Sequence, residues 1–276
     1  MGKMIKIEFE RAFRSIGLWI SMIIGMIISI EHIFRVVMPQ AKSPLNYYIY
    51  DSAVSMPASA FQFWIEAGSS NFEGTLFVRL FPILAVMPYA VTYLSDIKDG
   101  MIKNFYTRTG KLNYLAAKYL AVFVTGGFAV TFPLIINFLI TTAVLPSIVF
   151  PIGVFTVNAN GMWSDIFYTH PYIYTMMMLL LMYVCGGLLA TMALIMSNLV
   201  NNRFVVILAP FIICEFTNAM IRLSHTLWVK KMAPAYLFDI SQKMSKDIKS
   251  YICYIVLMAV FGIIGYFIGG MRRETY

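Results

Sequence analysis

YIYTMMMLLLMYVCGGLLATMALIMSNL, the segment from Tyr172 to Leu199, contains no charged residue. A helix needs about 20 mostly apolar residues to cross the hydrocarbon core of a bilayer, and this segment is long enough. Its apolar residues are continuous and do not alternate with polar ones, which favours a helix over a strand of a membrane barrel. The segment therefore predicts a membrane-spanning α-helix.

Similar apolar runs extend this prediction to the whole chain. The 276 residues are 60% hydrophobic and 12% charged, and the mean hydropathy is +0.75. Soluble domains carry about 25% charged residues, so the composition indicates an integral membrane protein. We expect an all-α integral membrane protein with one transmembrane domain over residues 1–276 and six spans, at about 16–38, 76–94, 119–145, 172–199, 204–223 and 251–271.

The distribution of basic residues predicts the orientation of the chain. Cytoplasmic segments of membrane proteins are enriched in Lys and Arg. Six crossings with a cytoplasmic amino terminus place 12 of the 21 basic residues inside, together with both termini. The predicted location is the cell membrane, with multiple crossings.

A basic cluster between the fifth and sixth spans leaves an alternative open. It contains Arg222, Lys230, Lys231, Lys243, Lys246 and Lys249 and would lie outside the cell. If 204–223, which contains Pro210 and Glu215, returned to the same side instead of crossing, this cluster would become cytoplasmic. We retain six spans because re-entrant segments are usually shorter than this run of twenty residues.

The segment SDIKDGMIKNFYTRTGKLNYLAAK, from Ser95 to Lys118, interrupts the second and third apolar runs with basic residues. We expect the second helix to end at Gly100, because glycine readily adopts the left-handed conformation that ends helices. A short amphipathic helix is predicted over 101–107, and Thr109 is expected to cap the next helix. In the short helix, the apolar residues share one face: Met101, Ile102, Phe105 and Tyr106. The basic residues Lys103 and Arg108 lie elsewhere on it. An ordinary positive-inside loop is the alternative.

Two helical patterns lie near the amino terminus. Apolar residues at helical spacing before the first span predict an amphipathic helix, either in the cytoplasmic interface or as a solvated extension of that span. Within the span, small residues recur at every fourth position and predict a helix-packing stripe between or within subunits. The stripe consists of Gly17, Ser21, Gly25 and Ser29.

A sparse residue pattern accompanies the short helix at 101–107. It consists of Asp96, Gly100, Thr107, Arg108, Lys111, Tyr114 and Lys118. Together with the amino-terminal helix, a polar outer loop and a proline-containing second span, this pattern resembles the permease subunit of bacterial type-2 ATP-binding-cassette exporters. The resemblance covers nearly the whole chain in the order of its spans, with residue-level support between Phe81 and Lys118.

This resemblance implies a function and a set of partners. It implies that 101–107, flanked by Gly100 and Arg108, is a coupling helix that binds a groove of a separate cytosolic ATPase. It also implies a second permease subunit, identical or different, and a partly re-entrant outer segment between the fifth and sixth spans. The substrate would be hydrophobic or amphipathic, a peptide or a lipid-like molecule.

The chain itself is not expected to be an enzyme. The phosphate-binding motif GxxxxGK[ST] is absent, because Phe105 stands where the first glycine is required before Gly110 and Lys111. ATP and Mg²⁺ are therefore expected on the partner ATPase, and no cofactor or metal is expected on this chain. The basic residues are accounted for by membrane topology, so no nucleic acid is expected as a partner.

Glu215 is the acidic residue deepest in a predicted span. It lies about eleven residues from the start of the fifth span, near mid-bilayer at about 1.5 Å per residue. A carboxylate there must be protonated, paired or exposed to water. We predict that Glu215 and Asn218 form a polar stripe along a translocation path, with a hydrogen-bonded interhelical contact as the alternative. An ion-coupled secondary transporter or channel-like protein that uses Glu215 is the alternative function.

Overall fold

The computed structural model of the chain describes residues 1–42, 58–65, 71–149, 157, 161–224, 226–239 and 247–272. Within these residues the regular elements are all helical. Six of the helices described are long and apolar enough to cross a membrane, so the prediction of an all-helical, multi-pass membrane protein is confirmed. These six are Ile16–Lys42, Phe72–Lys98, Lys111–Val144, Pro171–Leu199, Arg203–Leu223 and Ile248–Arg272.

The amino-terminal part contains two separate helices. Helix α1 (Gly2–Phe13) ends at Arg14, and the extended backbone of Ser15 separates it from α2 (Ile16–His32). A π-helical turn and the short α3 (Met38–Lys42) continue α2, so the first candidate span runs four residues beyond the predicted end at 38. Because of the break at Ser15, α1 is not a continuous extension of the first span. It packs against α9.

The second candidate span is divided, whereas the sequence predicted one continuous helix over 76–94. Helix α6 (Phe72–Val86) begins earlier, and a turn over 87–90 separates it from α7 (Val91–Lys98). The turn contains Pro88, which lacks the backbone N–H that a continuing helix needs. Pro82 lies inside α6 without ending it.

The connection to the third span is helical, as predicted. Helix α8 (Met101–Thr109) is two residues longer than expected, and α9 (Lys111–Val144) begins just after Thr109, where a new helix leading into the apolar run at 119 was predicted. Thr109 does not cap α9: its hydroxyl donates to the Phe105 carbonyl oxygen (2.8 Å) within the last turn of α8. Gly110, with φ +81°, makes the turn between the two helices instead.

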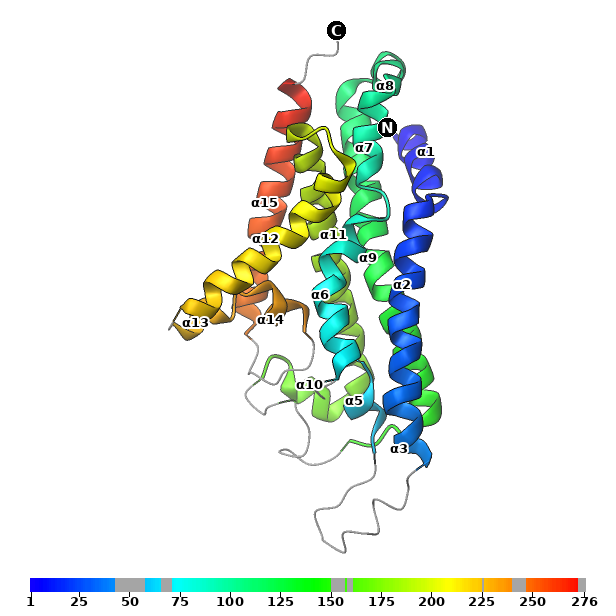
Figure 1. The fold of residues 1–276 in the computed structure, drawn as a ribbon, viewed down its shortest axis with the longest axis vertical. Coiled ribbons are helices and arrows are strands. Elements are labelled where there is room, and N and C mark those ends of the chain that lie inside the picture. The colour runs from blue at the N-terminus through cyan, green and yellow to red at the C-terminus, as the bar shows by residue number, and fades with distance from the viewer. Residues whose placement is uncertain are drawn as a thin grey trace, which may run out of the picture.

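The remaining helices form the second half of the molecule. Short helices at one end are α5 (Ala60–Phe63) and α10 (Ser164–Thr169), whereas the amino terminus, α8 and the end of α15 lie together at the other, named the α8 end (Figure 1). Helix α12 crosses the molecule obliquely from the α8 end (Figure 1). The bounds are α11 (Pro171–Leu199), α12 (Arg203–Leu223), α13 (Leu227–Lys230), α14 (Pro234–Phe238) and α15 (Ile248–Arg272).

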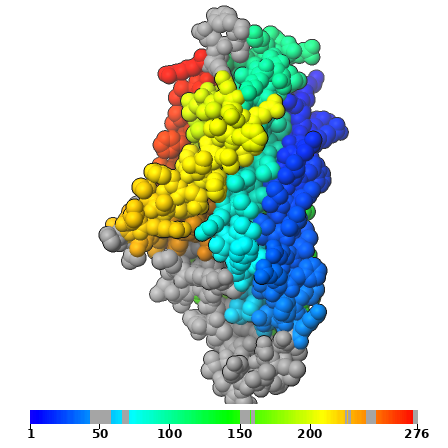
Figure 2. Space-filling view, in the orientation of Figure 1, coloured from blue at the N-terminus to red at the C-terminus, as the bar shows by residue number. Residues whose placement is uncertain are grey.

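Helix α12 is continuous over the segment for which re-entry was the alternative. Pro210 lies inside the helix, and the chain does not turn back before Leu223. Arg222 lies in the last turn of α12, Lys230 and Lys231 follow its far end, and Lys249 lies in the first turn of α15. Lys243 and Lys246 lie outside the described residues. Only 22% of the apolar window of α12 and 17% of that of α15 is buried, so both expose much of their apolar surface (Figure 2).

The small-residue stripe of α2 packs against helices of the same chain. A methyl group added to Gly17 would overlap the carbonyl oxygen of Met87, and one on Gly25 would lie 2.6 Å from the Pro133 ring of α9. Ser21 donates to the Leu84 carbonyl oxygen (2.7 Å), and Ser29 donates to that of Pro133 (3.2 Å). The stripe thus lets the backbones of α2, α6 and α9 approach closely.

Candidate functional site

Helix α8 is held between two glycine turns at the α8 end of the molecule. Gly100 precedes it with φ +69° and Gly110 follows it with φ +81°, in the region of backbone conformation that favours glycine. One face of α8 is attached to the bundle, and Ile102 on this face is buried. The ring centres of Phe105 and Tyr106 lie 5.4 and 5.7 Å from the ring centre of Tyr114 in α9. The short helix therefore rests on α9 and does not extend as a free loop.

The predicted ATPase-coupling residues divide between two faces of α8. Ile102 is buried, and Phe105 and Tyr106 are partly buried against the bundle, so these three side chains hold the helix in place. The exposed face consists of Met101, Lys103, Asn104, Thr107 and Arg108. Asn104 is an addition to the residues singled out from the sequence.

Four charged side chains meet beneath α8. Glu8 and Lys118 are completely buried, Asp96 is 2% exposed, and the Arg11 side chain is 31% exposed. We refer to Glu8, Arg11, Asp96 and Lys118 as the charge cluster. They come from α1, α7 and α9, so the cluster joins the amino-terminal helix to two helices that lie much further along the chain.

The pairing in the charge cluster is reciprocal. Lys118 Nζ lies 2.8 Å from Asp96 Oδ2 and 3.1 Å from Glu8 Oε2. Arg11 binds the other oxygen of each carboxylate, with Nη1 at 2.8 Å from Glu8 Oε1 and Nη2 at 2.6 Å from Asp96 Oδ1. Two cations and two anions thus balance in a buried site, which is the condition for tolerating charges away from water.

Two tyrosines complete the hydrogen bonding of the carboxylates. The Tyr89 hydroxyl, from the turn between α6 and α7, donates to Glu8 Oε2 (2.8 Å). The Tyr114 hydroxyl donates to Asp96 Oδ2 (2.7 Å). Burial disfavours the charged form of Arg11, but its hydrogen bonds to Asp96 and the surrounding negative charge prevail and raise its pKa above the ordinary value. Arg11 therefore stays protonated across the pH range in which proteins fold.

The charge cluster and α8 form one unit. Tyr114 binds Asp96 through its hydroxyl and supports α8 through its ring, and the guanidinium of Arg11 lies 5.4 Å from the centre of the Phe105 ring. At the start of α9, Lys111 Nζ donates to the carbonyl oxygen of Met271 in α15 (2.9 Å). A displacement of α8 would therefore be transmitted to α1, α7 and α9.

Sequence reasoning identified only part of the charge cluster. The residue pattern contained Asp96, Tyr114 and Lys118, which the structure brings together, but Glu8, Arg11 and Tyr89 were missed. One signal was available: Glu8 lies on the same face of α1 as the buried Met4 and Ala12. A carboxylate on the buried face of a helix requires a cationic partner.

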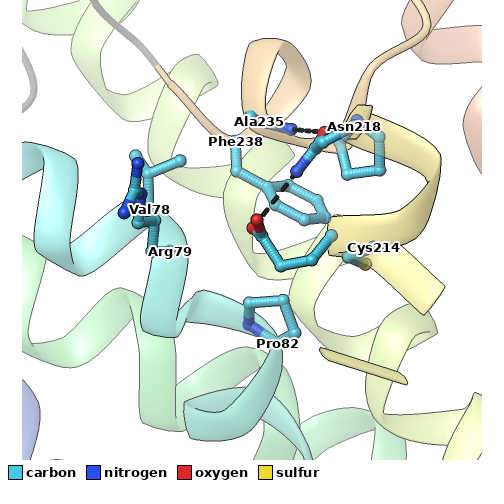
Figure 3. Close-up of a pocket in the computed structure, with 9 residues that line it drawn as sticks. Val78, Arg79, Pro82, Cys214, Asn218, Ala235 and Phe238 are labelled. Atoms are coloured by element: carbon cyan, nitrogen blue, oxygen red, sulfur yellow. Dashed lines mark hydrogen bonds between the residues drawn. The ribbon is translucent and has the colours of Figure 1, made fainter. Parts of the chain in front are cut away.

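The predicted intramembrane site also has a defined geometry. Asn218 is buried, and its Nδ2 donates to Glu215 Oε1 (3.3 Å) while its Oδ1 accepts from the backbone N–H of Ala235 (3.0 Å). These contacts tie α12 to α14 (Figure 3). Arg79 of α6 lines the same small pocket and was not singled out from the sequence.

Comparisons with known proteins and a search for metal-binding groups give no further assignment. In three comparisons, no protein-family model, no curated protein and no solved structure matched this chain. Within the described part of the chain, no group of three or more His, Cys, Asp or Glu side chains is arranged to hold a metal ion. The geometry of α8, the charge cluster and the α12 pocket therefore carries the functional argument.

Proposed function

We propose that this protein is the membrane-spanning permease subunit of an ATP-driven exporter and is driven by a separate cytosolic ATPase subunit. It works with a second permease subunit, identical or different, in the cell membrane of a bacterium. Both termini and α8 face the cytoplasm, and α1 lies at the cytoplasmic interface. Its substrate is hydrophobic or amphipathic, a peptide or a lipid-like molecule, and ATP and Mg²⁺ bind the partner.

The proposal rests on one observation, the rigid attachment of α8 between two candidate membrane-spanning helices. A motor protein can move membrane helices only through an element that does not yield when it is pushed. Helix α8 meets this requirement because Ile102, Phe105 and Tyr106 pack on α9 and because the charge cluster fixes the helices below it. A basic loop that served only membrane topology would need no such support.

The exposed face of α8 supplies the contact with the ATPase. Lys103 and Arg108 project from α8 beside apolar Met101, which is 44% exposed. An exposed pair of cations fits a partner groove lined by carboxylates, where charge complementarity sets specificity and the rate of association. We therefore expect ATPase binding to depend on this face and not on basic residues elsewhere at the same end.

The experiment is affinity purification of the tagged full-length chain from its native membrane, with the bound proteins identified by mass spectrometry. We expect a nucleotide-binding subunit to co-purify with the unchanged chain. The double variant Lys103→Glu/Arg108→Glu should lower the recovered ATPase at least about ten-fold, which corresponds to about 1.4 kcal/mol of binding free energy. A Gly/Ser linker in place of residues 101–107 should abolish recovery.

The matched control is Lys3→Glu/Lys6→Glu, which makes the same charge change on exposed residues of α1 at the same end of the molecule. It should retain the ATPase at nearly the level of the unchanged chain. Equal losses in both double variants would show a general charge effect and would remove the support for a docking role of α8.

The alternative function, an ion-coupled transporter or channel-like protein that uses Glu215, makes the opposite prediction. The carboxylate is partly buried in a helix long enough to span a membrane, which is the observation in its favour. Purified chain in vesicles would then transport under an ion gradient without any ATPase, and Glu215→Gln would abolish that transport. Such a result would replace the proposed function.

A further inference from the structure

We infer that Arg79, Glu215 and Asn218 form a binding site for the headgroup of a zwitterionic aminophospholipid, a lipid that carries a phosphate and a primary ammonium group. The inference goes beyond the proposed function, because binding can be measured on the purified chain without an ATPase. Only the further statement that this lipid is the exported substrate rests on the proposed function.

The pocket between α6 and α12 is lined by two oppositely charged side chains, one from each of these candidate membrane-spanning helices. Arg79 lies on α6 and Glu215 on α12, and both line the pocket, with Arg79 and Asn218 on opposite sides of it (Figure 3). Arg79 is exposed and Glu215 is partly buried. The pocket therefore offers one cation and one anion at the same place.

The charges of Arg79 and Glu215 do not neutralise each other through an ion pair. Among the residues that the structure describes, neither Arg79 nor Glu215 has an oppositely charged side chain within 4.0 Å. Within the described part of the chain, the Glu215 carboxylate accepts one hydrogen bond, from Asn218 (3.3 Å). Ionisable groups within membrane-spanning segments are rare and usually contact one another, a water-filled cavity or a bound ligand. A ligand with both charges would supply the missing partners.

The small size of the pocket favours a primary ammonium group over a larger cationic group. The space in which the centre of a water-sized group can lie is about 10 Å³, which is room for one such group. A primary ammonium group is close to water in size and can donate to Glu215, whereas the trimethylammonium group of choline is bulkier and has no N–H to donate. The remaining walls are apolar and include Val78, Pro82 and Phe238, which suit the body of a lipid.

Arg79 is suited to bind the phosphate of the headgroup. The planar guanidinium of arginine binds phosphate through two parallel hydrogen bonds, and Arg79 is exposed at the rim where a phosphate has room. Asn218 holds the carboxylate in position, because its other amide atom is fixed by the backbone N–H of Ala235. The ammonium thus enters the pocket and the phosphate stays at the rim.

The test measures lipid binding to purified, delipidated chain by native mass spectrometry. Phosphatidylethanolamine is compared with phosphatidylglycerol, which lacks the ammonium group, and with phosphatidylcholine, all with identical acyl chains. We expect phosphatidylethanolamine to bind at least ten-fold more tightly than either. Glu215→Gln should abolish this preference, and Arg79→Gln should weaken binding of all three lipids.

The matched controls are Glu10→Gln, in α1, and Arg14→Gln, directly after α1; both positions are exposed, and both changes should leave the preference intact. Glu215→Asp keeps the negative charge and should retain a preference even if Glu215→Gln folds poorly. Binding of the three lipids within two-fold of one another by the unchanged chain would overturn the inference, as would a preference that persists in folded Glu215→Gln. Either failure leaves ATPase co-purification unaffected, so the two proposals fail separately.

Discussion

Replacing Lys118 by methionine removes the ammonium group that two buried carboxylates share. Lys118 Nζ lies 2.8 Å from Asp96 and 3.1 Å from Glu8. At an effective dielectric constant of about 20, each pair has roughly 5–6 kcal/mol of gross Coulomb attraction, most of which desolvation offsets. Methionine fills a similar space but leaves Arg11 as the one remaining cation of the charge cluster. Removal of one partner from a buried charge pair destabilises a protein by about 3–5 kcal/mol.

The assay is thermal unfolding of the detergent-purified chain, followed by tryptophan fluorescence. For a chain of this length about 1 kcal/mol corresponds to roughly 2 °C in Tm, so Lys118→Met should lower Tm by roughly 6–10 °C. Adding Glu8→Gln removes the surplus negative charge and should recover about half of this loss. Lys6→Met is the control, because the Lys6 side chain is 80% exposed and its nitrogen lies 4.0 Å from the carboxylate of Glu10, a weak surface pair.

Two results would refute this reasoning. A Tm for Lys118→Met within about 2 °C of the unchanged chain would show that the buried carboxylates do not depend on the ammonium group. A Glu8→Gln/Lys118→Met variant no more stable than Lys118→Met would show that charge balance is not what holds the charge cluster together.

Three further substitutions test other parts of the structure by the same thermal measurement. Gly100→Ala places a side chain at φ +69° with no steric obstruction and should destabilise the chain by about 1–2 kcal/mol through backbone strain alone, whereas Gly2→Ala should have little effect. Gly17→Ala forces a methyl group against the Met87 carbonyl oxygen and should destabilise by about 1–3 kcal/mol; an unchanged Tm would contradict the close packing of α2 on α6. Asn137→Ala removes the acceptor of the buried Ile65 N–H (3.0 Å) and should destabilise by about 1–3 kcal/mol. Thr142→Ala, at a partly exposed position on the same helix, should cause a much smaller change.

The membrane-spanning helices could be predicted from the sequence because their signal is local. A run such as 172–199 is long and apolar enough to specify a helix without knowledge of its neighbours, and the structure begins that helix only one residue earlier. The division of the second span was less accessible. Pro82 and Pro88 lie in the same apolar run, yet only the turn at 87–90 interrupts the helix. Which proline ends a helix depends on packing that the sequence pattern does not contain.

The charge cluster could not be predicted for a related reason. A helix beginning after Thr109 was expected, and Lys111 and Lys118 do lie within the 34-residue α9, but the local pattern does not show that Lys118 is buried. The charge of Lys118 is balanced by its ion pairs with Glu8 and Asp96. Glu8 is more than a hundred residues away from Lys118 in the chain. A pattern of spacing cannot reveal such a partner, because the contact exists only after the helices have packed.

The burial of Lys118 has a consequence for how the chain is made. During insertion into a membrane, helices emerge one after another, and a lysine near the end of a span acts as an exposed positive charge that favours the cytoplasmic side. Before Lys118 packs against Glu8 and Asp96, it counts toward orientation like any other basic residue. After assembly it is completely buried and neutralised. In the orientation proposed above, the same ammonium group would first help to orient the nascent chain and would afterwards hold its finished helices together.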